Sequence, residues 1–76
     1  MGKNLKGLTD RQLEVIKTIS EKKLYKREEI ANALGISTTT VLTHLNAIYN
    51  KINEDRIAGI VNFYWSELRA KWATYF

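Results

Sequence analysis

The segment 37–52 has short hydrogen-bonding side chains on one side and no charged residue among them. They are hydroxyl and carboxamide groups at helical spacing, namely Thr39, Thr43, Asn46 and Asn50. An α-helix turns about 100° per residue, so a helix here directs all four to the same side. Such groups form hydrogen bonds to the edges of base pairs, whereas solvated residues are commonly Glu and Lys. The pattern indicates a surface for contacting base edges, and an ordinary solvated face is the alternative.

The opposite side of the same segment is apolar. Its residues recur at i, i+4, i+7 and i+11, and they are Val41, Leu45, Ile48 and Ile52. This spacing is typical of one buried helical face. Ser37 is expected to cap the helix, because a serine hydroxyl accepts a hydrogen bond from the first turn. His44 lies on the flank of the buried face, where we expect a structural role and no chemistry.

Composition argues against catalysis. The chain has one histidine, no cysteine and four glycines. The sequence therefore offers no convincing nucleophile–base pair, no thiolate metal site and no glycine-rich phosphate loop. Glu28 and Glu29 are adjacent, so a helix points them in different directions, as is typical of charges at a helix amino end. We expect no enzymatic activity, no metal and no cofactor.

Two further helices are expected before this segment. Residues 1–8 are predicted to be a flexible polar arm, followed by a single domain over 9–76. Thr9 and Gln12 match a capping box, so a helix is expected to begin at Thr9 and to run through Ser20. Its buried stripe consists of Leu13, Val15, Ile16 and Ile19.

The second helix is expected from about Arg27 to Leu34. Gly35 ends it, because glycine readily adopts the left-handed backbone that stops a helix. A short helix, a glycine turn and a longer helix with a polar outer face form the pattern of a helix-turn-helix. In that motif the second of the two helices enters the DNA major groove.

The chain is small and basic. It has 76 residues, a formal net charge of +4 and a sequence pI near 9.5. A basic balance favours a polyanionic partner without being specific to nucleic acid. The candidate phosphate contacts are Lys23, Lys26, Arg27, Thr38, Thr40 and Lys51. Such contacts position a protein on DNA without reading its sequence, and a solvated loop is the alternative for the basic residues.

The last part of the chain, about 54–76, is predicted to be a fourth helix that is unusually aromatic. Its first half, Ile57 to Val61, completes the core in this prediction. The second half has large apolar residues that a core of this size leaves uncovered, namely Tyr64, Trp65, Leu68, Trp72, Tyr75 and Phe76. Pairing with a second copy across a two-fold axis is the simplest cover, which predicts a homodimer. Folding of this part back onto the first helix is the alternative.

Two other roles of the aromatic part remain open. In the first, it docks a larger regulator or RNA polymerase, and the helix-turn-helix is only a scaffold. In the second, it lies on a membrane surface with Arg69 and Lys71 at the lipid headgroups. No apolar run approaches 18 residues and no signal-peptide core is found at the amino end, so we expect a cytoplasmic protein without a membrane partner.

Taken together, these motifs resemble the LuxR/GerE-type DNA-binding domain of bacterial transcription regulators over about residues 8–61. The resemblance is carried by Leu8 through Ile16, Glu29-Ile30-Ala31, Leu34, Ile36-Ser37, Thr40-Val41, His44-Leu45, Ile48, Lys51 and Arg56. It implies an all-α, four-helix domain of the short, stand-alone kind. It further implies that the third helix enters the major groove and that the extended fourth helix, about 54–76, dimerises.

Within the resemblance, the positions that the family often uses for base contacts correspond to Leu42, Thr43 and Asn46. Leu42 stands where a basic residue is common in the family, so the usual guanine reader is missing. Leu42 and the Thr43 methyl group suit thymine methyls, and asparagine suits adenine. We therefore expect a homodimer on double-stranded DNA with an inverted-repeat, A/T-leaning site. The base-contacting set is Thr39, Leu42, Thr43, Asn46 and Asn50.

Overall fold

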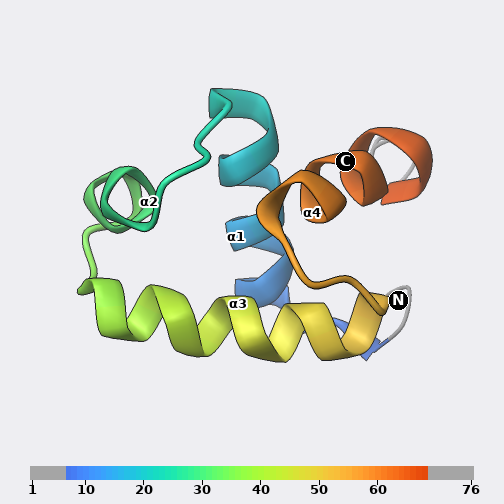
Figure 1. The fold of residues 1–76 in the computed structure, drawn as a ribbon, viewed down its shortest axis with the longest axis horizontal. Helices are drawn as coiled ribbons and strands as arrows, with labels where there is room; N and C mark the ends of the chain where they lie inside the picture. Colours follow the sequence, from blue (N-terminus) through green and yellow to red (C-terminus); the bar gives the residue numbers. More distant parts are fainter. Residues whose placement is uncertain (1–6, 69–76) are drawn as a thin grey trace.

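The computed structural model describes residues 7–68, and helices joined by short loops make up this range (Figure 1). The helices are α1 (Asp10–Lys22), α2 (Arg27–Leu34), α3 (Thr38–Ile52) and α4 (Ile57–Phe63), followed by the π-helical segment η2 (Tyr64–Leu68). The all-α fold class predicted from the sequence is confirmed. None of the helices in the described range is long and apolar enough to cross a membrane.

Helix α1 forms the centre of the core. In Figure 1 its first turns lie against α3, while α2 and α4 lie on opposite sides of it. The side chains without any exposed surface are Leu8, Val15, Ile16, Ile19, Ser20, Ile30, Val41, Ile48 and Ile60. The predicted stripe of α3 is confirmed, because its four apolar residues are at most 6% exposed. Leu8, which the sequence analysis assigns to the arm, belongs to the core.

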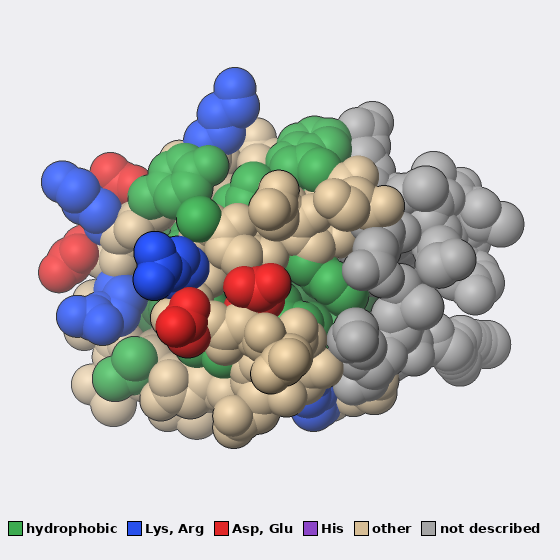
Figure 2. All heavy atoms as spheres, turned by 45° about the vertical axis from the view of Figure 1, so that its right-hand side comes forward, with side chains coloured by type: hydrophobic (Ala, Val, Ile, Leu, Met, Phe, Trp, Pro, Cys, Tyr) green, Lys and Arg blue, Asp and Glu red, His purple; other side chains and the backbone are tan. Residues whose placement is uncertain are grey.

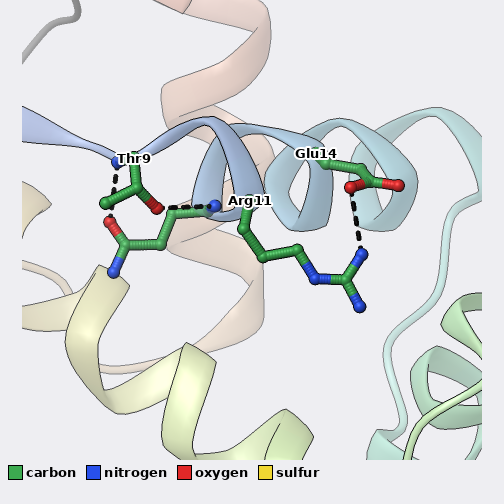
Figure 3. A network of polar contacts seen from close by, with 4 residues as sticks. Thr9, Arg11 and Glu14 are labelled. Carbon is green, nitrogen blue, oxygen red and sulfur yellow. Dashed lines mark hydrogen bonds and ion pairs between the residues drawn. The ribbon is translucent and has the colours of Figure 1, made fainter.

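The beginning of α1 and the end of α2 follow the predicted signals, while α1 continues to Lys22, beyond the predicted end at Ser20. Thr9 Oγ1 accepts a hydrogen bond from the Gln12 amide at 3.1 Å, and Gln12 Oε1 accepts one from the Thr9 amide at 3.0 Å. This reciprocal pair is the capping box. Figure 3 shows it together with the exposed ion pair between Arg11 and Glu14. At the end of α2, Gly35 has a φ of 69°, in the left-handed region that glycine favours.

A lysine joins the end of α3 to the beginning of α1. The Lys51 ammonium donates to Gly7 O and to Gln12 Oε1, each at 2.9 Å. Gln12 Oε1 therefore accepts two hydrogen bonds, one from the capping box and one from a residue 39 positions away. We call Gly7, Thr9, Gln12 and Lys51 the lysine junction. It holds the last turn of α3 against the entry to α1.

The C-terminal part differs from the prediction in two ways. The fourth helix begins at Ile57, after Arg56 as N-cap, and the α-helix ends at Phe63 where the π-helical turn η2 begins. A π-helix has more residues per turn than an α-helix, so the continuous α-helical stripe expected through residue 75 is wrong at Tyr64–Leu68. Tyr64 is also only 2% exposed, and its hydroxyl donates to Glu21 of α1. One aromatic side chain that the sequence analysis left uncovered is thus part of the protomer core.

Replacing Lys51 by methionine is expected to destabilise the domain. The change keeps the apolar stem of the side chain but removes two charge-assisted hydrogen bonds, for a loss of roughly 1–2 kcal/mol in the free energy of unfolding. Urea unfolding followed by circular dichroism measures it. Gln12→Glu is the matched change at the acceptor: it keeps the oxygen, adds a charge opposite to the ammonium, and should leave stability equal or higher. An unchanged midpoint for Lys51→Met would show that the junction does not stabilise the fold.

Ser20→Ala is expected to stabilise the protein. Ser20 has no exposed surface, and its hydroxyl has no hydrogen-bond partner among residues 7–68. Removing it eliminates an unsatisfied buried group and introduces the best helix former, for a gain of about 0.5–1 kcal/mol. The melting temperature of the variant should therefore rise, and a fall would indicate that the hydroxyl has an unseen partner.

Candidate nucleic-acid interface

The outer face of α3 has the residues that the sequence analysis assigned to base contact. All five are exposed, namely Thr39, Leu42, Thr43, Asn46 and Asn50. Leu42 is 41% exposed, an unusual position for a large apolar side chain on a small domain. Because the apolar residues on the other side of α3 are buried in the core, these five side chains face solvent. The structure brings the predicted set together on one surface, and we call this set the reading face.

The hydroxyl groups at the beginning of α3 are partly engaged with the helix itself. Ser37 Oγ accepts a hydrogen bond from the Thr40 amide at 3.1 Å and lies 3.0 Å from Thr40 Oγ1. Thr43 Oγ1 donates to Thr39 O at 3.2 Å. Ser37 is therefore the N-cap, as predicted, and the Thr43 hydroxyl hydrogen is used within the helix. Thr43 consequently offers its methyl group and oxygen lone pairs to a partner.

The first amides of α3 remain available to a partner. The first backbone bond of the helix runs from the Val41 amide to Ser37 O, so the amides of Thr38 and Thr39 precede the helical hydrogen-bond pattern. Thr38 and Thr40 are both exposed beside them. This arrangement is suited to an anion such as a phosphate group, because helix amino ends favour negative charge.

The predicted phosphate-contacting cations do not share one surface. Lys51 has its ammonium within the lysine junction, where two of its three N–H groups donate to Gly7 O and Gln12 Oε1. Lys23 is the C-cap of α1, and the loop that follows lies at the opposite end of α1 from α3 (Figure 1). Lys26 is the exposed N-cap residue of α2. The loop thus begins at the end of α1 away from α3 and leads into α2, which packs against α3.

Among the predicted cations outside α3, Arg27 has an electrostatic effect on a side chain of α3, that of Tyr49. Burial raises the pKa of the Tyr49 phenol above its ordinary value, and the positive charge of Arg27 opposes this shift, while Asp55 adds to it. Tyr49 is half-buried on the flank of α3, seven residues after Leu42 and therefore on the same side of the helix. The sequence analysis did not identify Tyr49, although this spacing of seven was a usable signal.

Other charged groups near the reading face are locally paired or mixed in sign. Arg56 Nε lies 3.4 Å from Asp55 Oδ1, so it bonds within the loop before α4. Figure 2 shows a face of the molecule on which Lys and Arg side chains alternate with Asp and Glu instead of forming a continuous basic patch. His44 is half-buried, and no group of three or more His, Cys, Asp or Glu side chains in residues 7–68 is placed to hold a metal ion.

The predicted dimer contacts divide into three groups. Tyr64 is buried within the protomer, as described above. Trp65 is 46% exposed and forms an edge-to-face pair with Tyr64, with ring centroids 5.1 Å apart and planes at 81°. The side chain of Leu68 and the residues Trp72, Tyr75 and Phe76 lie outside the part of the chain that the structure describes. Within that part, Trp65 is thus the predicted contact that remains on the surface.

Comparison with known proteins identifies a family for this fold. Residues 6–64 match the model of the family described as bacterial regulatory proteins, luxR family, also named GerE. Comparison with curated proteins and with solved structures gave no match. The matched range begins just before the lysine junction and ends at Tyr64, so it contains α1 to α4 and the whole reading face. With most of its residues inside this match, the chain belongs to the LuxR family of bacterial regulatory proteins, whose helix-turn-helix domains bind DNA.

Proposed function

We propose that this protein is a sequence-specific transcription regulator that places α3 in the major groove of double-stranded DNA. The observation that carries the proposal is the reading face, an exposed surface of five uncharged side chains on a helix whose other side is buried. Ridges of hydroxyl, amide and methyl groups fit the donors, acceptors and thymine methyls of that groove. Membership of the family supports DNA binding, and the assignment of these five side chains to base contact is our proposal.

Base preference follows from the side chains on the reading face. Asn46 pairs well with adenine, because its amide donates and accepts at the adenine edge, and Leu42 and the Thr43 methyl group suit thymine. The described part of this face has no Lys or Arg to bind the guanine edge. The proposed half-site is therefore rich in A·T pairs.

A homodimer is the second part of the proposal. A two-fold dimer presents two copies of α3 to successive major grooves, so half-sites about one helical turn apart, roughly 34 Å, form an inverted repeat. Exposed Trp65 and the aromatic residues that follow it in sequence are the proposed contact between copies. A small domain gains stability from such an interface, because it buries little apolar surface alone.

Alanine at Asn46 or Thr43 is expected to relax base preference. Loss of the Asn46 amide should cost about 1–3 kcal/mol of discrimination at one base pair of each half-site. Selection from a random duplex pool, followed by competition between the selected and scrambled duplexes, measures this discrimination. Asn62→Ala removes an equivalent exposed amide from α4 and is the matched control.

Preserved preference in both α3 variants would contradict the proposed reading face. The alternative function would then be favoured, in which the aromatic C-terminal part docks RNA polymerase or a larger regulator. Selection that returns no motif for the unaltered protein would contradict sequence-specific binding itself.

Trp72→Ala is expected to weaken the homodimer. Buried tryptophans at interfaces often contribute at least 2 kcal/mol, so the dimer dissociation constant should rise about thirtyfold or more. Sedimentation equilibrium across protein concentration measures it. Tyr25→Ala, which removes an aromatic side chain that is 53% exposed in the loop after α1, is the control. An unaltered dimer in Trp72→Ala would place the interface elsewhere, and a monomeric parent protein would contradict the homodimer.

A further inference from the structure

The flanks of α3 decide which of its side chains meet the DNA backbone. An α-helix with its side chains is about 10–12 Å across, and the major groove is about 12 Å wide. A helix that fills the groove therefore has the phosphates of the two groove edges along its flanks. Side chains on the reading face then meet base edges, whereas donors on either flank meet phosphate oxygens.

Tyr49 is a donor on one of these flanks. It follows Asn46 by three positions and Leu42 by seven. At about 100° per residue, its side chain is thus rotated roughly 60° to one side of Asn46 and lies close to Leu42 around the helix. Tyr49 is half-buried and packs against the hydrophobic core, which holds its ring in place. Its hydroxyl has no hydrogen-bond partner among residues 7–68, so it is available to a ligand.

The environment of Tyr49 keeps its phenol in the form that donates. Burial raises the pKa of Tyr49 above its ordinary value, so the hydroxyl keeps its proton throughout the neutral range. A protonated phenol donates to a phosphate oxygen, whereas a phenolate would repel it. Because the ring is already packed on the core, a bond made by the hydroxyl costs little additional side-chain entropy.

A positive charge lies on the same side of α3. Helix α2 packs against α3, and Arg27 is the first residue of α2. Its guanidinium lies close enough to Tyr49 for its charge to oppose the rise in the pKa of the phenol. Arg27 is exposed, and no carboxylate within residues 7–68 forms an ion pair with it. Its charge is therefore available to attract a phosphate.

The acidic groups around this flank are directed elsewhere or paired. Asp55 acts on Tyr49 with the opposite sign, but its Oδ1 lies 3.4 Å from Arg56 Nε, which offsets part of its charge. Glu28 and Glu29 follow in the first turn of α2. They are rotated by about 100° and 200° from the first residue of that helix, so they point to other sides of it.

We propose that the Tyr49 hydroxyl donates a hydrogen bond to a DNA phosphate at the edge of the major groove, and that Arg27 neutralises phosphates of the same edge. The inference rests on the proposed function, since it requires α3 to lie in the groove. It adds a neutral phosphate contact to the helix that reads the bases. Such a contact fixes the rotation and depth of α3, and with them the register of the reading face.

The test uses Tyr49→Phe, which removes the hydroxyl and keeps the ring in the core. Affinity for the duplex that the unaltered protein selects is measured by fluorescence anisotropy at physiological salt, and it should fall about tenfold for one lost hydrogen bond to a charged acceptor. The loss should be equal for selected and scrambled duplexes, because a phosphate contact does not read sequence. Tyr25→Phe removes an exposed phenol hydroxyl from the loop after α1 and is the matched control. Thermal unfolding of both variants checks that the fold is kept.

Salt dependence separates the two residues. Arg27→Gln removes a charge, so the slope of log K against log salt should become shallower by about 0.9, whereas Tyr49→Phe should leave the slope unchanged. The contacted phosphate is located by replacing single phosphates of the selected duplex with uncharged methylphosphonates. At that phosphate, the difference in affinity between the parent and Tyr49→Phe should shrink, and at other phosphates it should persist.

Each negative result has a separate meaning. Equal affinity of the parent and Tyr49→Phe, an equal loss in Tyr25→Phe, or a changed base preference in Tyr49→Phe would overturn the phosphate contact of Tyr49. An unchanged salt slope in Arg27→Gln would overturn the role of Arg27. Failure of the unaltered protein to prefer its selected duplex would instead overturn the proposed function.

Discussion

Helix α3 contributes one side to the hydrophobic core and the opposite side to the reading face, and the rest of the structure depends on this constraint. Val41, Leu45, Ile48 and Ile52 of α3 complete the core against α1, with at most 6% of any of them exposed. A helix that contributes a full apolar stripe to a core has its remaining arc directed to solvent. The reading face is therefore a geometric consequence of how the core is packed. A change in the rotation of α3 about its axis would bury Leu42 or Thr39 and expose part of the stripe.

The orientation of α3 depends on a few polar contacts as well as on apolar packing. At its beginning, Ser37 and Gly35 set the angle between α2 and α3 through an N-cap and a left-handed residue. At its end, the lysine junction ties Lys51 to the first turn of α1. Apolar packing alone is tolerant of small rotations, whereas hydrogen bonds at both ends of a helix restrict them. A small domain needs such restraints, since its core contributes little surplus stability.

Local sequence signals predicted most of this architecture. The capping box at Thr9, Gly35 at the end of α2 and the apolar period in α3 each depend on residues within one turn of each other, so the sequence alone contains them. The exposure of the five reading-face residues followed from the same period. The lysine junction could not be predicted, because its hydrogen bonds join residues 39 and 44 positions apart. The sequence analysis consequently assigned Lys51 to DNA alone and missed its bonds within the domain.

The C-terminal part shows a different reason for failure. The expected continuous α-helix assumed 3.6 residues per turn through residue 75, and the π-helical turn at Tyr64–Leu68 breaks that register. The burial of Tyr64 against α1 and its bond to Glu21 accompany this turn. Analysis of a 3.6-residue period assumes an α-helix throughout, so it does not reveal a π-helical segment, which is rare and has a wider turn.

DNA binding combines two tasks, reading the bases and attracting the phosphates, and in this domain they depend on different residues. Base reading depends on the short side chains of α3, which its own helical period arranges. Electrostatic attraction to phosphates has to come from cations outside the reading face, because the five side chains of that face are uncharged. Lys51 contributes to the fold through its bonds to Gly7 O and Gln12 Oε1. The uncharged reading face is then an advantage for specificity: contacts that carry sequence information stay free of the non-specific attraction that any cation has for any phosphate.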